Sequence, residues 1–217
     1  MMTRKRLNES LFGKSHPLGK YAYLDDYSNI NIEDLKEFYR KNYHSGNVTI
    51  FVSGKVTDDI VTKIDRAFGD EQWGEVKAAT SFIDVEPMPC EEKHIFIRKE
   101  NALQSSLRMG GFFLDREHPD FLKSRVLVTL FGGYFGSRLM SNIREDKGYT
   151  YGIGAGVISY PHRGILAIST EAANEFIPYI ITEVYSEMDR LCNDMVSDKE
   201  LNMVKSNSPV ESSVLIF

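Results

Sequence analysis

The sequence has few cysteines, no long hydrophobic run and no excess of basic residues. Its 217 residues include only Cys90 and Cys192, too few for a disulfide scaffold or a cysteine-based zinc site. No apolar run approaches the roughly 18 residues of a membrane-spanning helix. The net charge is −5, and the one basic cluster, at residues 4–6, belongs to a polar terminus. We therefore expect neither a membrane span nor nucleic-acid binding.

Motifs that carry common catalytic chemistry are also missing. None of the five histidines stands at metal-ligand spacing, and neither His-Glu-x-x-His nor His-x-x-Glu-His occurs. There is no Gly-x-Ser-x-Gly elbow. The glycine cluster at 132–136 lacks a following Gly-Lys-Ser/Thr and a preceding strand, so it indicates a tight turn between helices rather than a nucleotide site. We expect this chain to hold no metal and no cofactor. No signal peptide is visible, which makes a cytoplasmic location the default expectation.

The first third of the chain predicts a helix, a strand and a second helix. Asn31 can cap a helix whose apolar stripe comprises Leu35, Phe38, Tyr39 and Tyr43. Residues 47–54 are rich in β-branched side chains and predict a buried strand. Thr57 can cap a helix that ends at Ala67 or Phe68. Residues 31–68 therefore predict part of a layered α/β domain that has too few strands to stand alone.

Residues 69–92 are rich in Pro, Glu and Gly and predict a linker. The block that follows alternates strands and helices. We expect strands at 94–98 and 105–113, helices at 117–130 and 137–147, a hairpin from 149–159 and 164–171, and helices at 174–192 and 198–205. This order predicts an α+β fold in which helices cover one face of a mainly antiparallel sheet.

The strongest local signal spans residues 144–151. Arg144 lies late in a predicted helix, Gly148 is a natural helix stop, and Tyr151 begins the next strand. This turn can bring Arg144 and Tyr151 to one edge of the sheet. A guanidinium and a phenol there could both donate to a carbonyl oxygen or an oxyanion. A surface arginine beside a half-buried tyrosine is the simpler interpretation of the residues alone.

Four stretches in the same order resemble the M16 family of zinc peptidases, which includes pitrilysin and the mitochondrial processing peptidases. Residues 131–151, Phe-Gly-Gly-Tyr-Phe-Gly-Ser-Arg-Leu-Met-Ser-Asn-Ile-Arg-Glu-Asp-Lys-Gly-Tyr-Thr-Tyr, carry the most specific match. The others are His-Pro-Leu-Gly at 16–19, residues 32–56, and residues 104–110. Together they cover roughly residues 11–205.

The resemblance implies a LuxS/metallohydrolase-like M16 half-domain, since an M16 subunit consists of two similar α+β halves. Residues 1–68 would end the first half, 69–92 would link the halves, and 93–217 would form a second half shortened at its C-terminal end. The family's Arg/Tyr pair maps onto Arg144 and Tyr151, which would hold the substrate carbonyl. The second half would also present a strand edge to an extended peptide.

Two functions follow from the resemblance. The chain could be the substrate-binding, non-zinc portion of a zinc metallopeptidase, inactive without a zinc-bearing half or partner subunit. It could instead be a non-catalytic scaffold or interaction subunit. The expected partners are a peptide or unfolded protein, the zinc-bearing half, and a second subunit in a homo- or heterodimer. Pro209 breaks the helix that family members continue, so a truncated gene, a separate domain and a degenerate end all stay open.

Overall fold

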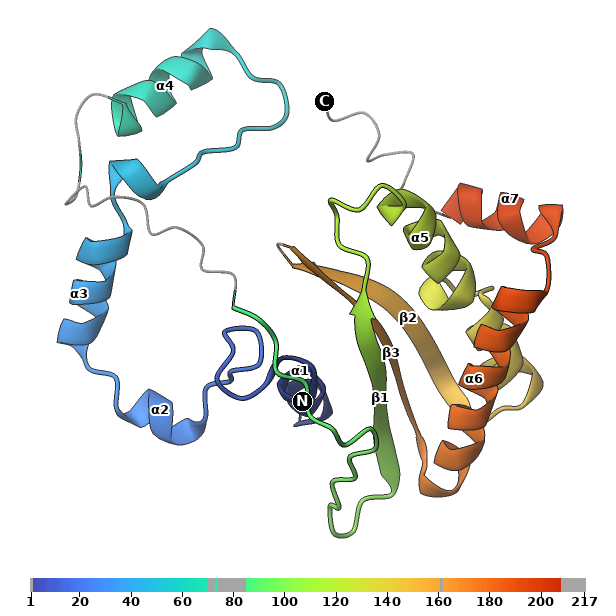
Figure 1. The fold of residues 1–217 in the computed structure, drawn as a ribbon. Coiled ribbons are helices and arrows are strands. Elements are labelled where there is room, and N and C mark those ends of the chain that lie inside the picture. The colour runs from blue at the N-terminus through green and yellow to red at the C-terminus, as the bar shows by residue number, and fades with distance from the viewer. Residues whose placement is uncertain (1, 70–72, 74–84, 161, 208–217) are drawn as a thin grey trace. The chain divides into compact units, whose positions relative to one another are not determined.

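The computed structural model describes residues 2–69, 73, 85–160 and 162–207 (Figure 1). Two compact units divide the chain, one formed by residues 1–20 and 86–217, the other by residues 21–85. Residues 1–20, which the resemblance assigns to the first half, therefore group with the later part of the chain. Most of the predicted linker at 69–92 lies outside the described residues.

The larger unit contains a three-stranded antiparallel sheet in the order β1-β3-β2 (Figure 1). The strands are β1 (Gln104–Phe113), β2 (Thr150–Tyr160) and β3 (Arg163–Ala173). The predicted hairpin is confirmed, and β3 pairs in register with all ten residues of β1. The α+β fold class predicted from the sequence is correct.

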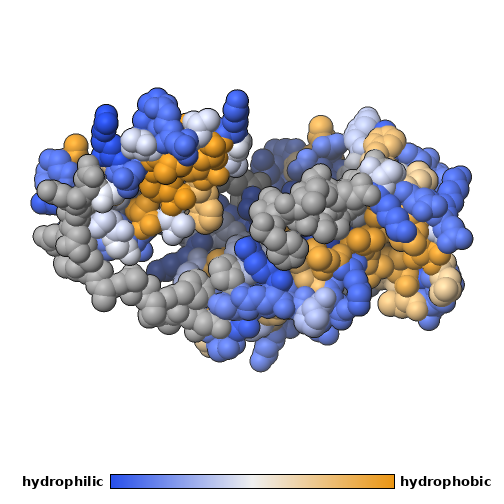
Figure 2. All heavy atoms as spheres, turned by 90° about the horizontal axis from the view of Figure 1, so that it is seen from above, coloured by the Kyte–Doolittle hydropathy of each residue, from blue (hydrophilic) through white to orange (hydrophobic). Residues whose placement is uncertain are grey.

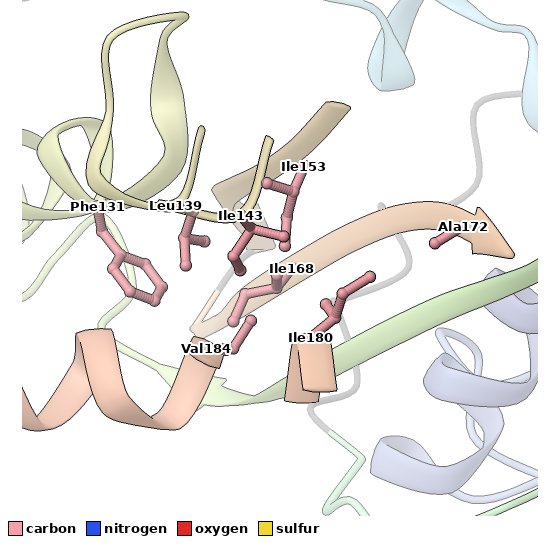
Figure 3. Close-up of a cluster of buried hydrophobic side chains, with 8 residues drawn as sticks. All are labelled: Phe131, Leu139, Ile143, Ile153, Ile168, Ala172, Ile180 and Val184. Carbon is pink, nitrogen blue, oxygen red and sulfur yellow. The ribbon is translucent and has the colours of Figure 1, made fainter. Parts of the chain in front are cut away.

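Helices cover one face of this sheet. They are α5 (Phe121–Val128), the π-helical segments η2 (Thr129–Gly133) and η3 (Met140–Asp146), the short η4 (Asn174–Phe176), α6 (Ile177–Asn193) and α7 (Asp198–Asn207). Eight buried side chains form the core between this layer and the sheet, and Figure 3 shows them converging: Phe131, Leu139, Ile143, Ile153, Ile168, Ala172, Ile180 and Val184. Burial of this apolar surface is the main stabilising contribution to the unit.

A helix that the sequence analysis does not predict, α1 (Met2–Phe12), packs on β1. Because Leu107 and Met109 of β1 contact the core, the alternate residues Gly110 and Phe112 point to the opposite face. A Cβ on Gly110 would lie 3.2 Å from Leu7, and the Phe12 ring meets Phe112 edge-on at 5.5 Å. The α1 helix therefore covers part of the second face of the sheet.

The smaller unit contains α2 (Leu24–Ser28), α3 (Ile32–Asn42), η1 (Ser45–Asn47) and α4 (Asp58–Phe68). The predicted cap of α3 is present, because Asn31 Oδ1 accepts hydrogen bonds from the backbone N–H groups of Glu33 and Asp34, at 2.9 and 3.0 Å. The predicted strand at 47–54 is absent, as is the one at 94–98 in the other unit. A strand requires a ladder partner, and neither segment pairs with any described residue.

Large apolar side chains of the smaller unit are exposed, and Figure 2 shows the hydrophobic surface that results. The stripe of α3 is uncovered, with Leu35, Phe38 and Tyr39 each more than half exposed. Phe51 of the predicted strand is 91% exposed. No described residue of this unit contributes a hydrophobic side chain to the buried core. The apolar pattern of these residues is typical of side chains that are buried against a second layer, but here the side chains are exposed.

Candidate functional site

The site is built on the turn between η3 and β2. Gly148 adopts a φ of 65°, the left-handed conformation that favours glycine, and its N–H bonds the carbonyl of Arg144 at 3.2 Å. The N–H of Tyr149 bonds the carbonyl of Ile143 at 3.1 Å. These bonds satisfy carbonyls at the end of the helix and reverse the chain into β2. The predicted helix stop at Gly148 is present in the structure.

The structure brings Arg144 and Tyr151 together. The Nε of Arg144 donates to the backbone carbonyl of Tyr151 at 3.0 Å. The guanidinium carbon also lies 4.5 Å from the ring centroid of Phe135, a cation–π geometry. Nη1 lies 3.7 Å from Glu145 Oε1, and the Arg144 side chain keeps 34% of its surface exposed. Arg144 is therefore oriented on two sides and still open to solvent.

Tyr151 projects away from the sheet, with 93% of its surface exposed. Simple strand alternation would place Tyr149 and Tyr151 on one face, but the start of β2 is not a regular strand. A register shift between Thr150 and Ile153 forms a β-bulge, which re-aims the side chains of the strand. Tyr149 instead stacks on Phe176, with centroids 5.1 Å apart.

The outer edge of β2 is covered where the strand begins. The N–H of Ile153 donates to the Sδ of Met140 at 3.4 Å, and the carbonyl of Tyr151 accepts a hydrogen bond from the Nε of Arg144. Gly132 lies against the next part of the strand, because a Cβ there would stand 2.6 Å from the N of Ala155. The glycine cluster therefore serves close packing, and a peptide cannot pair with this end of β2 without displacing these contacts.

Sequence reasoning missed an ion pair that joins α7 to the helical layer. Arg138 donates from Nε to Glu200 Oε1 at 2.9 Å and from Nη2 to Oε2 at 3.4 Å. The hydrogen bond from Arg138 lowers the pKa of Glu200 to about 2, and bonds from the backbone and side chain of Ser197 add to the effect. A motif search for catalytic residues gives no sign of this pair, because its partners lie 62 positions apart.

A second polar network, also missed, holds η3 against α6. Asn142 Nδ2 donates to Glu187 Oε1 at 2.7 Å and to Glu183 Oε2 at 3.1 Å. Glu183 pairs with Lys147, and the hydrogen bond from that lysine lowers the pKa of the carboxyl. Glu187 is 1% exposed and pairs with Arg190 at 2.7 Å. These contacts fix the segment that carries Arg144.

The described residues of this chain do not fit a zinc site. No three His, Cys, Asp or Glu side chains among them gather closely enough to hold a metal ion. The ring nitrogens of two histidines are engaged locally, since Nδ1 of His16 accepts from the N–H of Leu18 and Nδ1 of His118 accepts from the N–H of Asp120. No helix in the described part is long and apolar enough to cross a membrane.

Comparison with known proteins shows which family and which relatives this chain is similar to. A family model described as "Peptidase M16 inactive domain" matches residues 29–208. An "Uncharacterized zinc protease" of Rickettsia felis is 26% identical over 94% of this chain and 48% of its own length. The "Uncharacterized zinc protease YmxG" of Bacillus subtilis is 25% identical over 92% of this chain and 47% of its own length. The chain thus spans about half the length of these curated relatives.

A solved structure shows the same fold. The crystal structure of a peptidase M16 inactive domain from Pseudomonas fluorescens superposes with a TM-score of 0.75 at 24% sequence identity. The match covers 98% of this chain and 51% of that one. At this identity the likeness establishes the fold and leaves the chemistry to be argued from the residues.

Proposed function

This chain belongs to the peptidase M16 inactive-domain family, and on that premise we propose that it is the substrate-binding, non-zinc portion of an M16-like zinc metallopeptidase. The observation that carries the proposal is the contact between Arg144 and Tyr151. The Arg144 guanidinium binds the backbone carbonyl of Tyr151 at 3.0 Å, and the phenol of the same tyrosine is exposed at the start of β2.

Within the described part of the chain, no group accepts a hydrogen bond from the Tyr151 hydroxyl or from the Nη groups of Arg144, although Nη1 lies 3.7 Å from Glu145. The guanidinium has five N–H donors, and the bond to Tyr151 takes the one on Nε. The Nη groups and the Tyr151 hydroxyl can therefore donate to a peptide carbonyl and, more strongly, to the oxyanion that forms when water attacks it. Donors positioned before the reaction stabilise that charge without reorganising, which is where most of their catalytic effect arises.

Zinc, in this proposal, binds in another half or in a partner subunit and supplies the activated water. The smaller unit supports such a partner. Its helix α3 and the segment at 47–54 present apolar side chains to solvent, and the segment has no ladder partner among the described residues. A sheet of the zinc-bearing half would give 47–54 its missing neighbours and cover the stripe. We therefore keep residues 1–68 as the proposed end of a first M16-like half.

The test is reconstitution with the protein from the same genome that carries His-x-x-Glu-His, followed by peptide turnover. Arg144→Ala and Tyr151→Phe should each lower kcat by about 10²- to 10³-fold if each side chain is a full oxyanion donor. Arg98→Ala and Tyr185→Phe, at exposed positions with no recorded contact to Arg144 or Tyr151, serve as matched controls that should keep the wild-type turnover.

A scaffold or interaction subunit is the second candidate, and two contacts of Arg144 favour it. The Nε of Arg144 and the face of its guanidinium are engaged within the chain, by Tyr151 and Phe135, so the arginine also has a purely structural use. Unchanged turnover in both site variants would eliminate the catalytic-support proposal and support this one.

A further inference from the structure

The β-bulge at the start of β2 leaves backbone groups outside the regular ladder. Thr150 pairs with Ala172 and Ile153 pairs with Thr170, so Tyr151 and Gly152 together lie opposite the single residue between those partners. Residues at a bulge lose their ladder hydrogen bonds. Backbone N–H and C=O groups next to a buried core require other partners.

Two buried threonine hydroxyls supply those partners. Thr150 is 8% exposed and Thr170 is 3% exposed. The Thr150 hydroxyl donates to the carbonyl of Glu171 at 2.7 Å and accepts from the N–H of Gly152 at 3.2 Å. The Thr170 hydroxyl lies 2.9 Å both from the carbonyl of Gly152 and from the Thr150 hydroxyl. Both backbone groups of Gly152 are thereby held in place.

Gly152 directly follows Tyr151, so fixing its peptide groups fixes the carbonyl of Tyr151 that Arg144 binds. We infer that Thr150 and Thr170 are positioning residues, which hold the bulge so that the Tyr151 phenol faces outward and the Arg144 guanidinium keeps its 3.0 Å bond. The consequence for peptide binding rests on the proposed function. The positioning itself rests only on these contacts.

Packing alone gives no reason for threonine at these two positions. Both side chains adjoin the apolar core, beside Ile153, Ile168 and Ala172. Valine has nearly the same shape and would fill the space without a hydroxyl. A buried hydroxyl costs free energy unless it is hydrogen-bonded. The hydrogen bonds to the bulge are therefore the physical reason for the hydroxyls.

The experiment is residue-by-residue hydrogen exchange by NMR on the full 217-residue chain. Two groups report on the inference: the backbone N–H of Gly152 and the side-chain Nε–H of Arg144. In Thr150→Val/Thr170→Val we expect both to exchange roughly five- to tenfold faster than in the wild type. The two single variants are measured as well, and each should show a smaller change in the same direction.

Two controls separate positioning from loss of stability. Ile168→Val removes one buried methylene from the same core and leaves the hydroxyls in place, so it should not change exchange at Arg144 Nε. Thr150→Ser and Thr170→Ser keep the hydroxyls and should restore protection. Unchanged exchange at both reporter groups in the double valine variant would overturn the inference, as would an equal acceleration in Ile168→Val.

Peptide turnover of the reconstituted complex is the second measurement. If the valine variant lowers kcat with little change in KM, positioning and the proposed function are both supported. If exchange at Arg144 accelerates while turnover stays at the wild-type rate, the positioning role holds and the proposed catalytic support fails. The two claims are thus tested separately.

Discussion

The guanidinium carbon of Arg144 lies over the ring of Phe135, 4.5 Å from its centroid, although Phe135 is 62% exposed. A large apolar side chain at such exposure gains little from burial. The cation–π contact gives the ring a use, because it supports the arginine in addition to the bond with the Tyr151 carbonyl. Exposed contacts of this kind contribute about 0.5–1 kcal/mol.

Removing the aromatic face should loosen Arg144 without unfolding the chain. We expect Phe135→Leu, which keeps apolar volume and loses the π face, to lower turnover of the reconstituted complex about two- to fivefold, the rate equivalent of 0.5–1 kcal/mol. Phe135→Tyr keeps the ring and should retain the wild-type rate. Equal rates for the leucine and tyrosine variants would show that the contact does not matter to turnover.

The ion pair between Arg138 and Glu200 should make stability depend on acid. The pKa of Glu200 is about 2 in the folded chain, against an ordinary value of 4.5. The folded state therefore holds this proton less tightly than the unfolded state. The stabilisation is complete above pH 4.5 and is lost as the pH falls toward 2.

Denaturant unfolding at pH 6, 4 and 3 tests this dependence. Glu200→Gln should lower stability at pH 6 and should flatten the fall between pH 4.5 and 2, because the glutamine does not titrate. Asp59→Asn changes the net charge equally at an exposed carboxylate and is the control. A wild-type acid profile in Glu200→Gln would contradict the assignment.

Substitution of Gly148 should destabilise the chain because of the backbone conformation at this position. An alanine at φ 65° is strained, and we expect Gly148→Ala to lower the free energy of unfolding by about 1–2 kcal/mol. Gly148→Asn should cost less, because asparagine tolerates this conformation. Gly156→Ala is the matched control, since a Cβ there meets nothing within 4 Å. The prediction fails if the two alanine variants unfold at the same denaturant concentration.

The purified chain should bind no stoichiometric zinc. The sequence lacks a His-x-x-Glu-His motif, and no three potential metal ligands cluster among the described residues. Elemental analysis after gel filtration measures the metal content. About one tightly held zinc per chain, removed by a chelator together with any proteolysis, would overturn this expectation.

Local signals in the sequence predicted features of both units. The Asn31 cap, the Gly148 stop and the hairpin all depend on residues within a few positions of one another, which is the range that propensity and turn chemistry describe. The short turn at Gly148 also predicted that Arg144 and Tyr151 come close together, and Arg144 binds the backbone carbonyl of Tyr151.

Features that depend on distant residues were not predictable in this way. The bulge is stabilised by Thr170, twenty positions from Thr150, and it interrupts the regular alternation of side chains at the start of β2. Residues 47–54 have the composition of a strand. A strand forms only when it pairs with a neighbouring strand, and no described residue pairs with this segment. The polar terminus became α1 because β1, about a hundred positions later, offers it a surface.

The contact between α1 and β1 joins distant parts of the sequence, so it cannot form until both have been synthesised. The hydroxyl of Thr3 in α1 lies 3.2 Å from that of Ser106 in β1, across 103 positions, and β1 pairs with β3, which ends at Ala173. On a ribosome that adds about 5–20 residues per second, α1 would wait roughly ten to thirty seconds for its docking surface to be complete. We therefore expect the docking of α1 on β1, a contact between distant positions, to form late in folding.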